Sequence, residues 1–137
     1  MRTFFDSSGL AKRYIREPGS DKVDRLLAAA TDTAVSLVGP VEIISALGRL
    51  RRESRLTANA YAQIKLALFL DVEDMIVCNI TVPVVERAIV LLETHPVRTL
   101  DALHVAGALE WEAELFVSAD RRQLAAAEKS GLRIQAV

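Results

Sequence analysis

The sequence has few of the residues that build disulfide frameworks and zinc sites. Its 137 residues include one cysteine, Cys78, and two histidines, His95 and His104. A single cysteine forms no intrachain disulfide and builds no cysteine-based zinc site. Two histidines argue against a catalytic zinc that several imidazoles would hold. Disulfide-stapled folds and the common zinc enzymes are therefore not expected.

Long apolar runs are also missing. No stretch reaches the length of a bilayer span, and the apolar part of MRTFFDSSGL is far too short for a signal peptide. Half of the residues are apolar (51%) and a quarter are charged (26%), as in folded globular proteins. Because there is no internal repeat and no linker rich in proline and glycine, we expect one cytoplasmic domain over residues 1–137, without membrane attachment.

Charge of one sign is not in excess, because 17 basic and 18 acidic residues leave a net charge of -1. This balance lacks the basic surplus that is typical of proteins that bind nucleic acids. A cluster of carboxylates in one place can, however, offset a basic patch in another. The positions of the charges along the chain, and not the net charge, must therefore show whether the protein has a basic patch.

Short apolar segments alternate with segments of helical periodicity. We expect five strands, at residues 2–5, 33–36, 75–80, 115–118 and 133–137. We expect helices at about residues 7–16, 23–30, 38–52, 57–70, 83–93, 100–112 and 120–130. This alternation predicts a parallel sheet that helices cover on both faces. Such sheets bind ligands beyond the carboxyl ends of their strands, near the point where the strand order reverses.

Two aspartates follow predicted strands closely. Asp6 ends the segment FFD, which should belong to the central strand, and Asp120 follows LFVSA. Either residue can simply cap the next helix, and Asp120 with Gln123 fits a capping box. The end of an apolar strand is also where a parallel-sheet enzyme places a functional carboxylate, and a cap does not exclude a metal ligand because a carboxylate has two oxygens.

Glu42 is the one charged residue in the apolar segment VEIISAL. A carboxylate is rarely buried without a partner, because desolvation of its ionised form is costly. Arg49, seven residues on, is a candidate partner on the same side of the helix. We favour the other interpretation, in which Glu42 has a functional role.

Asp101 and His104 lie in LDALHVAGAL, a segment that is apolar nearly all round and is therefore expected to be a buried helix. An aspartate in the first turn of a helix is favourable with the helix dipole, which is the alternative to a functional role for Asp101. A lone histidine in such a helix is more often a hydrogen-bonded core residue than a ligand. We therefore leave His104 out of the catalytic set.

Together, the carboxylates indicate a known chemistry. Mg2+ and Mn2+ prefer hard oxygen ligands, often one or two carboxylates with waters and substrate phosphate. Cleavage of a phosphodiester needs an activated water and stabilisation of charge on the phosphate, and metal ions on clustered carboxylates supply both. The candidate catalytic and metal-binding residues are Asp6, Glu42, Asp101 and Asp120.

Four segments resemble PIN-domain ribonucleases, specifically VapC-type toxins of toxin–antitoxin pairs. They are FFDSSGLAKRYIREPGS, VEIISALGRL, TLDALHVAGAL and LFVSADRRQLAAAEKSGLRI, which occur in the order of the family and span essentially the whole chain. The resemblance implies a three-layer α/β/α sandwich around a parallel sheet of about five strands, with an acidic cluster at its carboxyl edge. The segment SLVGP before Glu42 departs from many relatives, which carry a more polar segment there.

The resemblance also implies an activity, the hydrolysis of RNA by a metal-activated water. The family has four acidic positions that bind one or two divalent cations, and these match Asp6, Glu42, Asp101 and Asp120. Ser118 falls where the family commonly has a small polar residue oriented toward the site, and Ser7 is a further supporting residue. The implied partners are the RNA substrate, a second copy of the chain, and a VapB-type antitoxin whose apolar arm blocks the site.

Basic residues flank the same motifs. A run of arginines from Arg49 to Arg55 ends the helix of Glu42, and Arg13 and Arg121 lie in the first and last motifs. Solvated cations near a helix C-terminus are the ordinary explanation of such a run. Beside an acidic metal site, Arg13, Arg49 and Arg121 are instead candidates for contacts with the RNA backbone. Aromatic residues are only 5% of the chain, so we expect recognition of RNA shape rather than base stacking.

Other functions fit less well. A phosphoacceptor receiver domain needs an aspartate after the third strand, and MIVCNIT has none. A phosphatase of the haloacid-dehalogenase type needs Asp-x-Asp after the first strand, where this chain has Asp6-Ser7-Ser8. A PIN-like module that binds RNA or protein without cleaving it is the remaining alternative, and a metal-dependent cleavage assay separates it from the nuclease.

Overall fold

The computed structural model describes all residues from 1 to 137 and contains one sheet of five parallel strands. The strands are β1 (Arg2–Phe5), β2 (Asp32–Ser36), β3 (Ile76–Cys78), β4 (Leu115–Ser118) and β5 (Arg133–Ala136). Their order across the sheet is β3-β2-β1-β4-β5, so β1 is the central strand. The expected five-stranded parallel sheet is confirmed.

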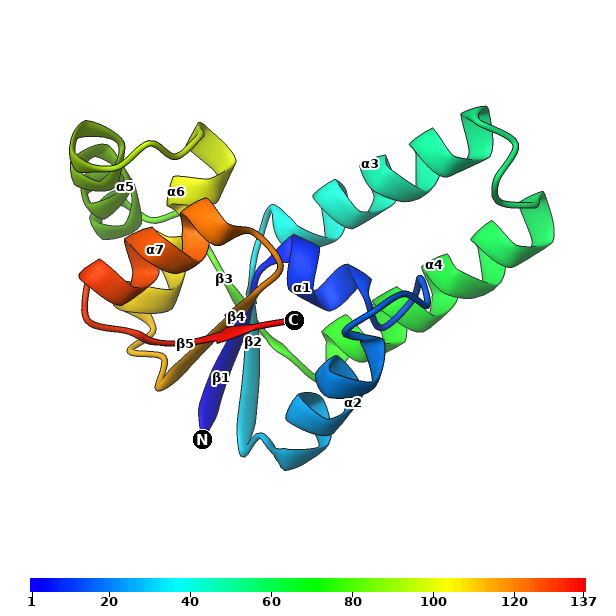
Figure 1. Ribbon diagram of the computed structural model, residues 1–137, viewed down its shortest axis with the longest axis horizontal. Helices are drawn as coiled ribbons and strands as arrows, with labels where there is room; N and C mark the ends of the chain where they lie inside the picture. Colours follow the sequence, from blue (N-terminus) through cyan, green and yellow to red (C-terminus); the bar gives the residue numbers. More distant parts are fainter.

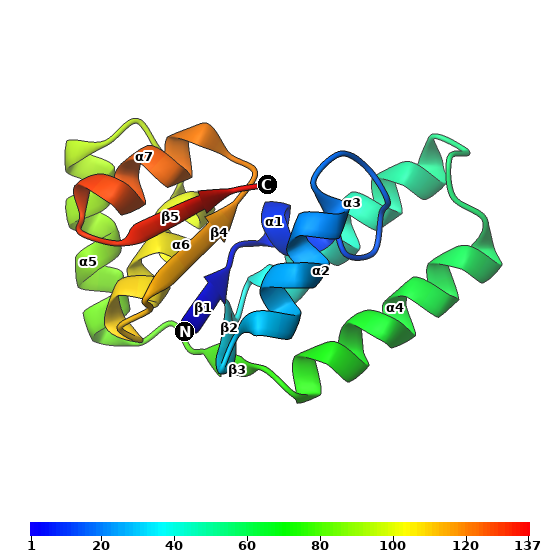
Figure 2. The ribbon, with the colours of Figure 1, turned by 60° about the horizontal axis from the view of Figure 1, so that its bottom comes forward.

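Seven helices cover this sheet (Figure 1). They are α1 (Ser7–Ala11), α2 (Ser20–Ala29), α3 (Gly39–Arg52), α4 (Ala58–Glu73), α5 (Val82–Thr94), α6 (Thr99–Glu110) and α7 (Arg121–Lys129). The helices α5, α6 and α7 lie on one face and α1 to α4 on the other, and α3 and α4 extend side by side beyond the sheet (Figure 2). The expected three-layer α/β/α sandwich is therefore confirmed. None of these helices combines the length and the apolar composition that crossing a bilayer requires.

Alternation along the strands builds one apolar core on each face of the sheet. Phe4 and Phe116 belong to the core under α5, α6 and α7, and their rings stack with centroids 5.9 Å apart. Phe5 and Val117, the next residues along the same strands, belong to the core under α1 to α4. All four side chains are fully buried. The central strands are apolar on both sides because both faces of the sheet are covered.

The carboxyl ends of β1 and β4 form the switch point of the sheet. From β1 the chain builds β2 and β3 on one side, and then crosses to β4 and β5 on the other. Phe5 is in register with Val117, so the two strands end side by side. The chain leaves them toward opposite faces, into α1 and α7, which is the arrangement that forms a ligand site in open parallel sheets. Asp6 and Asp120 lie at this point.

Two elements differ most from their expected lengths. The first helix was expected to reach residue 16, but α1 ends at Ala11, and Arg13 and Tyr14 follow in tighter turns that bond to carbonyls three residues back. The third strand was expected over residues 75–80, but β3 has three residues. It lies at the edge of the sheet, where Ile76 is 43% exposed. An edge strand has one neighbour, so fewer residues are paired.

Candidate active site

Asp6 lies at the carboxyl end of β1 and is fully buried. As the N-cap of α1, its Oδ1 accepts the backbone N–H of Gly9 at 2.8 Å, and its Oδ2 accepts the hydroxyls of Ser8 and Ser118, each at 2.8 Å. A Cβ atom at position 9 would lie 3.1 Å from Oδ1, so glycine permits this close approach. Burial raises the pKa of Asp6 above its ordinary value, while the charge of His104 and these hydrogen bonds act to lower it.

Asp120 is the N-cap of α7 and is linked to Asp6 through one hydroxyl. Ser118 Oγ accepts the backbone N–H of Asp120 at 2.9 Å and donates to Asp6 at 2.8 Å. Asp120 Oδ1 accepts the backbone N–H groups of Arg122 at 2.8 Å and Gln123 at 3.3 Å. The expected cap is therefore present, and the second oxygen of Asp120 accepts no hydrogen bond from the protein.

Asp101 lies in the first turn of α6, next to the start of α7. Its Oδ2 accepts the backbone N–H of Arg98 at 3.2 Å, and its Oδ1 accepts the side-chain amide of Gln123 at 3.1 Å. Gln123 is buried. Its side chain donates to Asp101, and its backbone N–H donates to Asp120. Burial raises the pKa of Asp101, the Arg98 N–H lowers it, and the negative charges of Asp120 and Glu42 raise it further.

Glu42 lies in the first turn of α3 and binds a histidine from the opposite face of the sheet. Its Oε1 accepts a hydrogen bond from Nε2 of His104, which is fully buried on α6. The same nitrogen lies 3.5 Å from the hydroxyl of Ser7. Arg49, the partner that the sequence suggested, forms no ion pair with Glu42. Both α3 and α6 begin near the carboxyl edge of the sheet, so Glu42 in the first turn of α3 lies within reach of His104 in the second turn of α6.

Shared neighbours gather the four candidate carboxylates around the switch point. Ser118, Gln123 and His104 each contact at least one of them, and the charges of Glu42, Asp120 and His104 act on Asp101. No three histidine, cysteine, aspartate or glutamate side chains, however, stand close enough together to hold a metal ion as they lie. The site is an open ring of acidic groups rather than a closed cage.

The donor set of this ring fits a hydrated divalent cation. Its donors are carboxylate oxygens, and Mg2+ usually keeps several waters while binding one or two carboxylates. Glu42 uses one oxygen for His104, and Asp120 uses one for the amides of α7, so each has an oxygen without a protein hydrogen bond. Glu42 is also 27% exposed, which leaves it accessible from solvent. A cation held through few carboxylates and waters therefore needs no cage of three.

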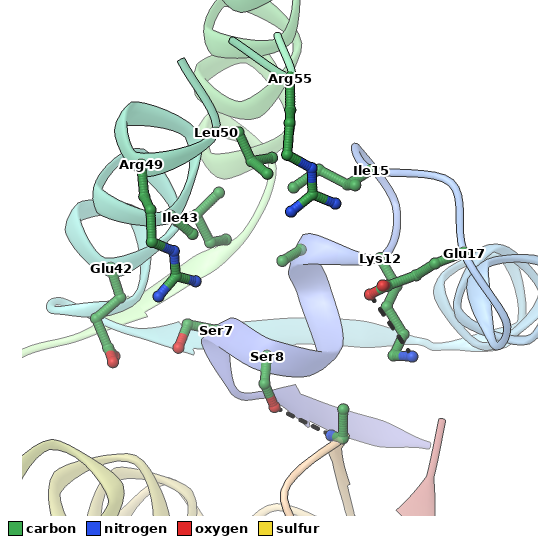
Figure 3. Close-up of a pocket in the computed structure, with 13 residues that line it drawn as sticks. Ser7, Ser8, Lys12, Ile15, Glu17, Glu42, Ile43, Arg49, Leu50 and Arg55 are labelled. Atoms are coloured by element: carbon green, nitrogen blue, oxygen red, sulfur yellow. Dashed lines mark hydrogen bonds and ion pairs between the residues drawn. The ribbon is translucent and has the colours of Figure 1, made fainter. Parts of the chain in front are cut away.

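A cavity of about 510 Å3 opens beside Glu42, between α1 and α3 (Figure 3). Its apolar lining includes Ile15, Ile43 and Leu50, and Figure 3 shows the guanidinium groups of Arg49 and Arg55 extending from the α3 side toward α1. Lys12 lies on the opposite wall, where it is paired with Glu17 at 3.7 Å. A second cavity of about 350 Å3 adjoins Glu42 and is lined by Arg49 and Arg52. Positive charge therefore lies directly beside the acidic ring.

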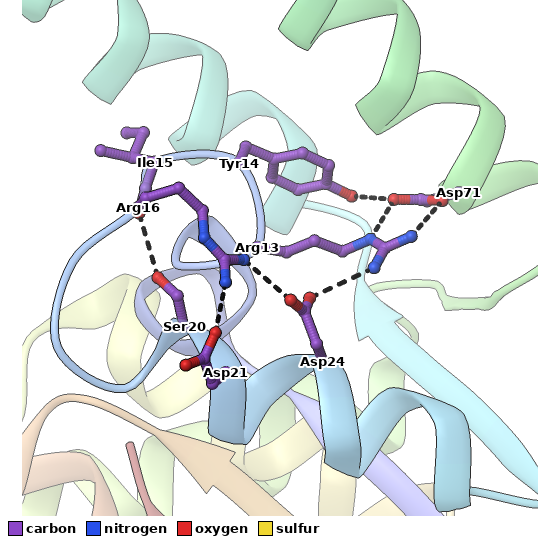
Figure 4. A network of polar contacts seen from close by, with 8 residues as sticks. All are labelled: Arg13, Tyr14, Ile15, Arg16, Ser20, Asp21, Asp24 and Asp71. Carbon is purple, nitrogen blue, oxygen red and sulfur yellow. Dashed lines mark hydrogen bonds and ion pairs between the residues drawn. The ribbon is translucent and has the colours of Figure 1, made fainter.

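The arginines that the sequence suggested for RNA contacts lie in different places. Arg49 lines both cavities beside Glu42, and Arg121 is exposed at the start of α7. Arg13 instead donates to Asp71 of α4 at 2.7 Å and to Asp24 of α2 at 3.3 Å (Figure 4). The Arg13 guanidinium is therefore engaged in ion pairs that connect these helices, and its contact with the RNA backbone stays a prediction.

Two residues outside the predicted set contact the carboxylates. His104 is the hydrogen-bonded core residue that its segment indicates, but its partner is Glu42. Its position one turn after Asp101 on α6 was the available signal. Gln123 was expected to close a capping box with Asp120, but its side chain contacts Asp101, and Ser118 binds the N–H of Asp120 instead. The sequence carried no signal that Gln123 would contact Asp101 or that Ser118 would bind the N–H of Asp120.

The PIN domain family model matches residues 3–129. No curated protein matches the sequence. The fold is similar to that of VapC20 from Mycobacterium tuberculosis, a toxin that cleaves the sarcin-ricin loop, with a TM-score of 0.71, 19% identity and 95% of both chains covered. VapBC-1 from nontypeable Haemophilus influenzae gives a TM-score of 0.70 at 15% identity, covering 99% of this chain and 98% of the other.

VapBC2 from Rickettsia felis, bound to a DNA fragment from its promoter, gives a TM-score of 0.68 at 14% identity, covering 100% of this chain and 99% of the other. At such identities the structural likeness establishes the fold, which agrees with the family match. That match covers nearly the whole chain and includes all four candidate carboxylates. The chain belongs to the PIN domain family.

Proposed function

We propose that this protein is a Mg2+- or Mn2+-dependent endoribonuclease and the toxin of a VapBC-type toxin–antitoxin pair. The observation that carries the proposal is the gathering of four carboxylates at the switch point of a PIN-domain sheet. Solved structures of the same fold include a toxin that cleaves the sarcin-ricin loop and several toxin–antitoxin complexes, which supports the proposal. We further propose that residues 1–137 form one PIN domain that acts in the cytoplasm.

In this proposal, Asp6, Asp101 and Asp120 hold the cation, and Glu42 binds it directly or orients a water. A bound divalent cation lowers the pKa of its water and neutralises charge on the phosphate. Ser118 orients Asp6 by donating to Oδ2, and it fixes the start of α7 by accepting the N–H of Asp120. Ser7 supports the site from the first turn of α1, beside His104.

The RNA backbone would lie along the basic walls beside the acidic ring. Arg49 and Arg55 line the cavity at Glu42, and Arg121 is exposed next to Asp120. Guanidinium groups bind phosphate through charge and paired hydrogen bonds, and the charge contribution falls with added salt. These contacts would hold the backbone without reading its bases.

The cavity of about 510 Å3 is also the place that we propose for the apolar arm of a VapB-type antitoxin. Side chains of Ile15, Ile43 and Leu50 line it, so it offers apolar contacts directly beside Glu42. An arm in this cavity would cover Arg49 and Arg55 as well. Inhibition would then follow because RNA and antitoxin compete for one space.

We also propose a homodimer, supported by an unpartnered stripe on α5. Val82, Val85, Ile89 and Leu92 follow at helical spacing and are 71%, 41%, 51% and 40% exposed. The neighbouring side of the same helix, with Val84, Ala88 and Leu91, is buried in the core. A helix that is apolar on its outer side indicates contact with another protein surface.

The alternative is a PIN-like module that binds RNA or protein without cleaving it. One observation favours it, because no three acidic or histidine side chains lie close enough together to hold a metal ion. Binding through Asp6, Asp101 and Asp120 together would require these side chains to move closer to one another, whereas a hydrated cation held through one or two carboxylates would not. The cleavage experiment below separates the two functions.

The wild-type chain is expected to cleave a defined RNA pool with Mg2+ or Mn2+ and not with a chelator. Asp6→Asn and Asp101→Asn should each lower the cleavage rate by about 100-fold or more, because each removes a charged oxygen ligand. Mg2+ should raise the Tm of the wild type by preferential binding to the folded state, and the variants should lose most of this rise. Cleavage is followed by gel electrophoresis and Tm by calorimetry.

Asp32→Asn is the matched control, because Asp32 is exposed at the first residue of β2, away from the carboxyl edge. It should cleave like the wild type. Wild-type rates for Asp6→Asn and Asp101→Asn would contradict the assignment. A wild-type chain that binds RNA but cleaves none with any divalent cation would favour the alternative, a PIN-like module that binds RNA without cleaving it.

A further inference from the structure

His104 is a buried polar residue to which the proposed mechanism assigns no role. It is fully buried on α6, one turn after Asp101. A Cβ atom at Gly39 would lie 3.8 Å from Cε1 of His104, so the first residue of α3 lies close to the imidazole ring. The ring thus lies between the helix that carries Asp101 and the helix that carries Glu42.

The polar contacts of this imidazole all go through one nitrogen. Nε2 binds Oε1 of Glu42 and lies 3.5 Å from the hydroxyl of Ser7. Nδ1 is buried and has no hydrogen-bond partner. An ionised carboxylate only accepts hydrogen bonds, so Nε2 carries a proton and donates it to Glu42.

Packing alone does not explain a histidine at this position. A buried nitrogen without a partner costs free energy, whereas an apolar side chain of similar volume would fill the same space without that cost. The neighbouring residues on α6, Ala102 to Ala108, are otherwise leucine, valine, alanine and glycine, so an apolar residue would match them. What His104 contributes, and an apolar residue would not, is the hydrogen bond to Glu42.

That hydrogen bond restrains Glu42 by one oxygen and leaves the other without a protein partner. Oε1 is bound by His104, whereas Oε2 accepts no hydrogen bond from the protein in a side chain that is 27% exposed. Carboxylates that bind metals are commonly oriented in this way, by a hydrogen bond from an outer residue to the ligand. Without it, Glu42 on the first turn of α3 would turn freely toward solvent.

We propose that His104 is a positioning residue that orients Glu42 toward a divalent cation. The inference rests on the proposed function, and it names the residue that orients one of the four carboxylates for metal binding. A purely structural pair would predict a loss of stability when His104 is replaced. A positioning role predicts a loss of metal affinity that a donor of similar reach restores.

The test compares Mn2+ binding to the full chain, by calorimetry and by electron paramagnetic resonance, in the wild type and two variants. His104→Leu fills the core but removes the donor, and it should weaken Mn2+ binding by about 10–100-fold. His104→Gln places an amide N–H near the position of Nε2, and it should restore affinity to about the wild-type level. His95→Gln is the matched control at the other histidine and should leave the affinity unchanged.

A double variant tests the route of the effect. In a Glu42→Gln background, His104→Leu should weaken Mn2+ binding no further, because its action passes through Glu42. Wild-type affinity in folded His104→Leu would overturn the inference, and so would a full additional loss in the double variant.

If His104→Leu does not fold, His104→Asn replaces it, since its shorter amide does not reach Glu42. Equal affinities of the Asn and Gln variants would then overturn the inference.

The outcome for the wild type distinguishes this inference from the proposed function. Mn2+ binding by the wild type that is insensitive to His104 would overturn the positioning role and leave the nuclease proposal standing. A wild-type chain that binds no Mn2+ would overturn the metal-dependent nuclease, and the positioning role with it.

Discussion

At the scale of single residues, every candidate carboxylate also has an ordinary structural partner. Asp6 and Asp120 cap helices, Asp101 binds the N–H of Arg98, and Glu42 binds a buried histidine. These hydrogen bonds fix the orientation of each carboxylate before any ligand arrives. The structural and the functional interpretations of the sequence are therefore compatible at the same residue.

Metal-free Asp6→Asn protein is expected to be more stable than the wild type at neutral pH. Burial raises the pKa of Asp6 in the folded state, so the folded protein binds the proton more readily than the unfolded chain. The stability from this group is complete below the unfolded pKa of about 4, and it is lost as the pH rises through the folded pKa. Each unit of raised pKa corresponds to about 1.4 kcal/mol. Asparagine avoids this loss and still caps α1.

The measurement is thermal unfolding of both proteins in chelator, from about pH 4, the unfolded pKa of an aspartate, to about pH 8. The Tm advantage of Asp6→Asn should grow as the pH rises. A difference that stays constant over this range would show that the charge of buried Asp6 does not cost stability.

At the scale of elements, a polar network connects α2, α4 and the turn after α1 on one face of the sheet (Figure 4). Asp71 of α4 accepts hydrogen bonds from Arg13 and from the hydroxyl of Tyr14, each at 2.7 Å, in the turn after α1. Asp24 of α2 binds Arg13 and also Arg16, the latter at 2.8 Å. The network connects α4 to the turn after α1, and Asp6 is the N-cap of α1. It therefore supports the site from a distance.

Asp71→Asn is expected to lower the free energy of unfolding by about 1 kcal/mol at neutral pH, because partly exposed ion pairs contribute little more than that. Although burial raises the pKa of Asp71, the hydrogen bonds from Arg13 and Tyr14 outweigh it and lower the pKa overall. The stability from this group is thus present above the ordinary pKa of about 4 and is lost as the pH falls through the lowered folded value.

Urea unfolding at several pH values checks this expectation. The difference between Asp71→Asn and the wild type should shrink as the solution is acidified below about pH 4, the ordinary aspartate pKa. Glu73→Gln is the control on the same helix, since Glu73 is exposed and forms no ion pair, and it should change stability by less than about 0.5 kcal/mol. Equal destabilisation by both variants would refute the role of the network.

At the scale of the whole molecule, the apolar stripe on α5 should decide the oligomeric state. Ile89 is 51% exposed in the middle of this stripe. If two copies pack through it, Ile89→Glu would bury a charge against an apolar surface, which is costly without a partner. Light scattering after size exclusion is expected to give the mass of a dimer for the wild type and of a monomer for Ile89→Glu.

Ala125→Glu is the matched control, because Ala125 is exposed on α7 and does not belong to the stripe on α5. It should remain a dimer. A monomeric wild type would exclude the proposed homodimer, and a dimeric Ile89→Glu would move the interface away from α5.

The family and most elements could be predicted because their signals are local. Thr57 and Thr81 cap α4 and α5 with their own hydroxyls, and alternation of apolar residues marks strands wherever they lie in the sheet. The short α1 and the edge position of β3 were not predicted. Both depend on packing, since Arg13 and Tyr14 leave the helix to reach Asp71, and β3 has only one neighbouring strand.

The sequence by itself determined the order of strands and helices and the position of each acidic residue on them. It did so because periodicity, caps and strand ends are properties of neighbouring residues. Only the tertiary structure decided which side chains meet. Glu42 and His104 are 62 residues apart, and Asp101 and Gln123 are 22 apart, so their contacts exist only because helices from different parts of the chain begin at one edge of the sheet.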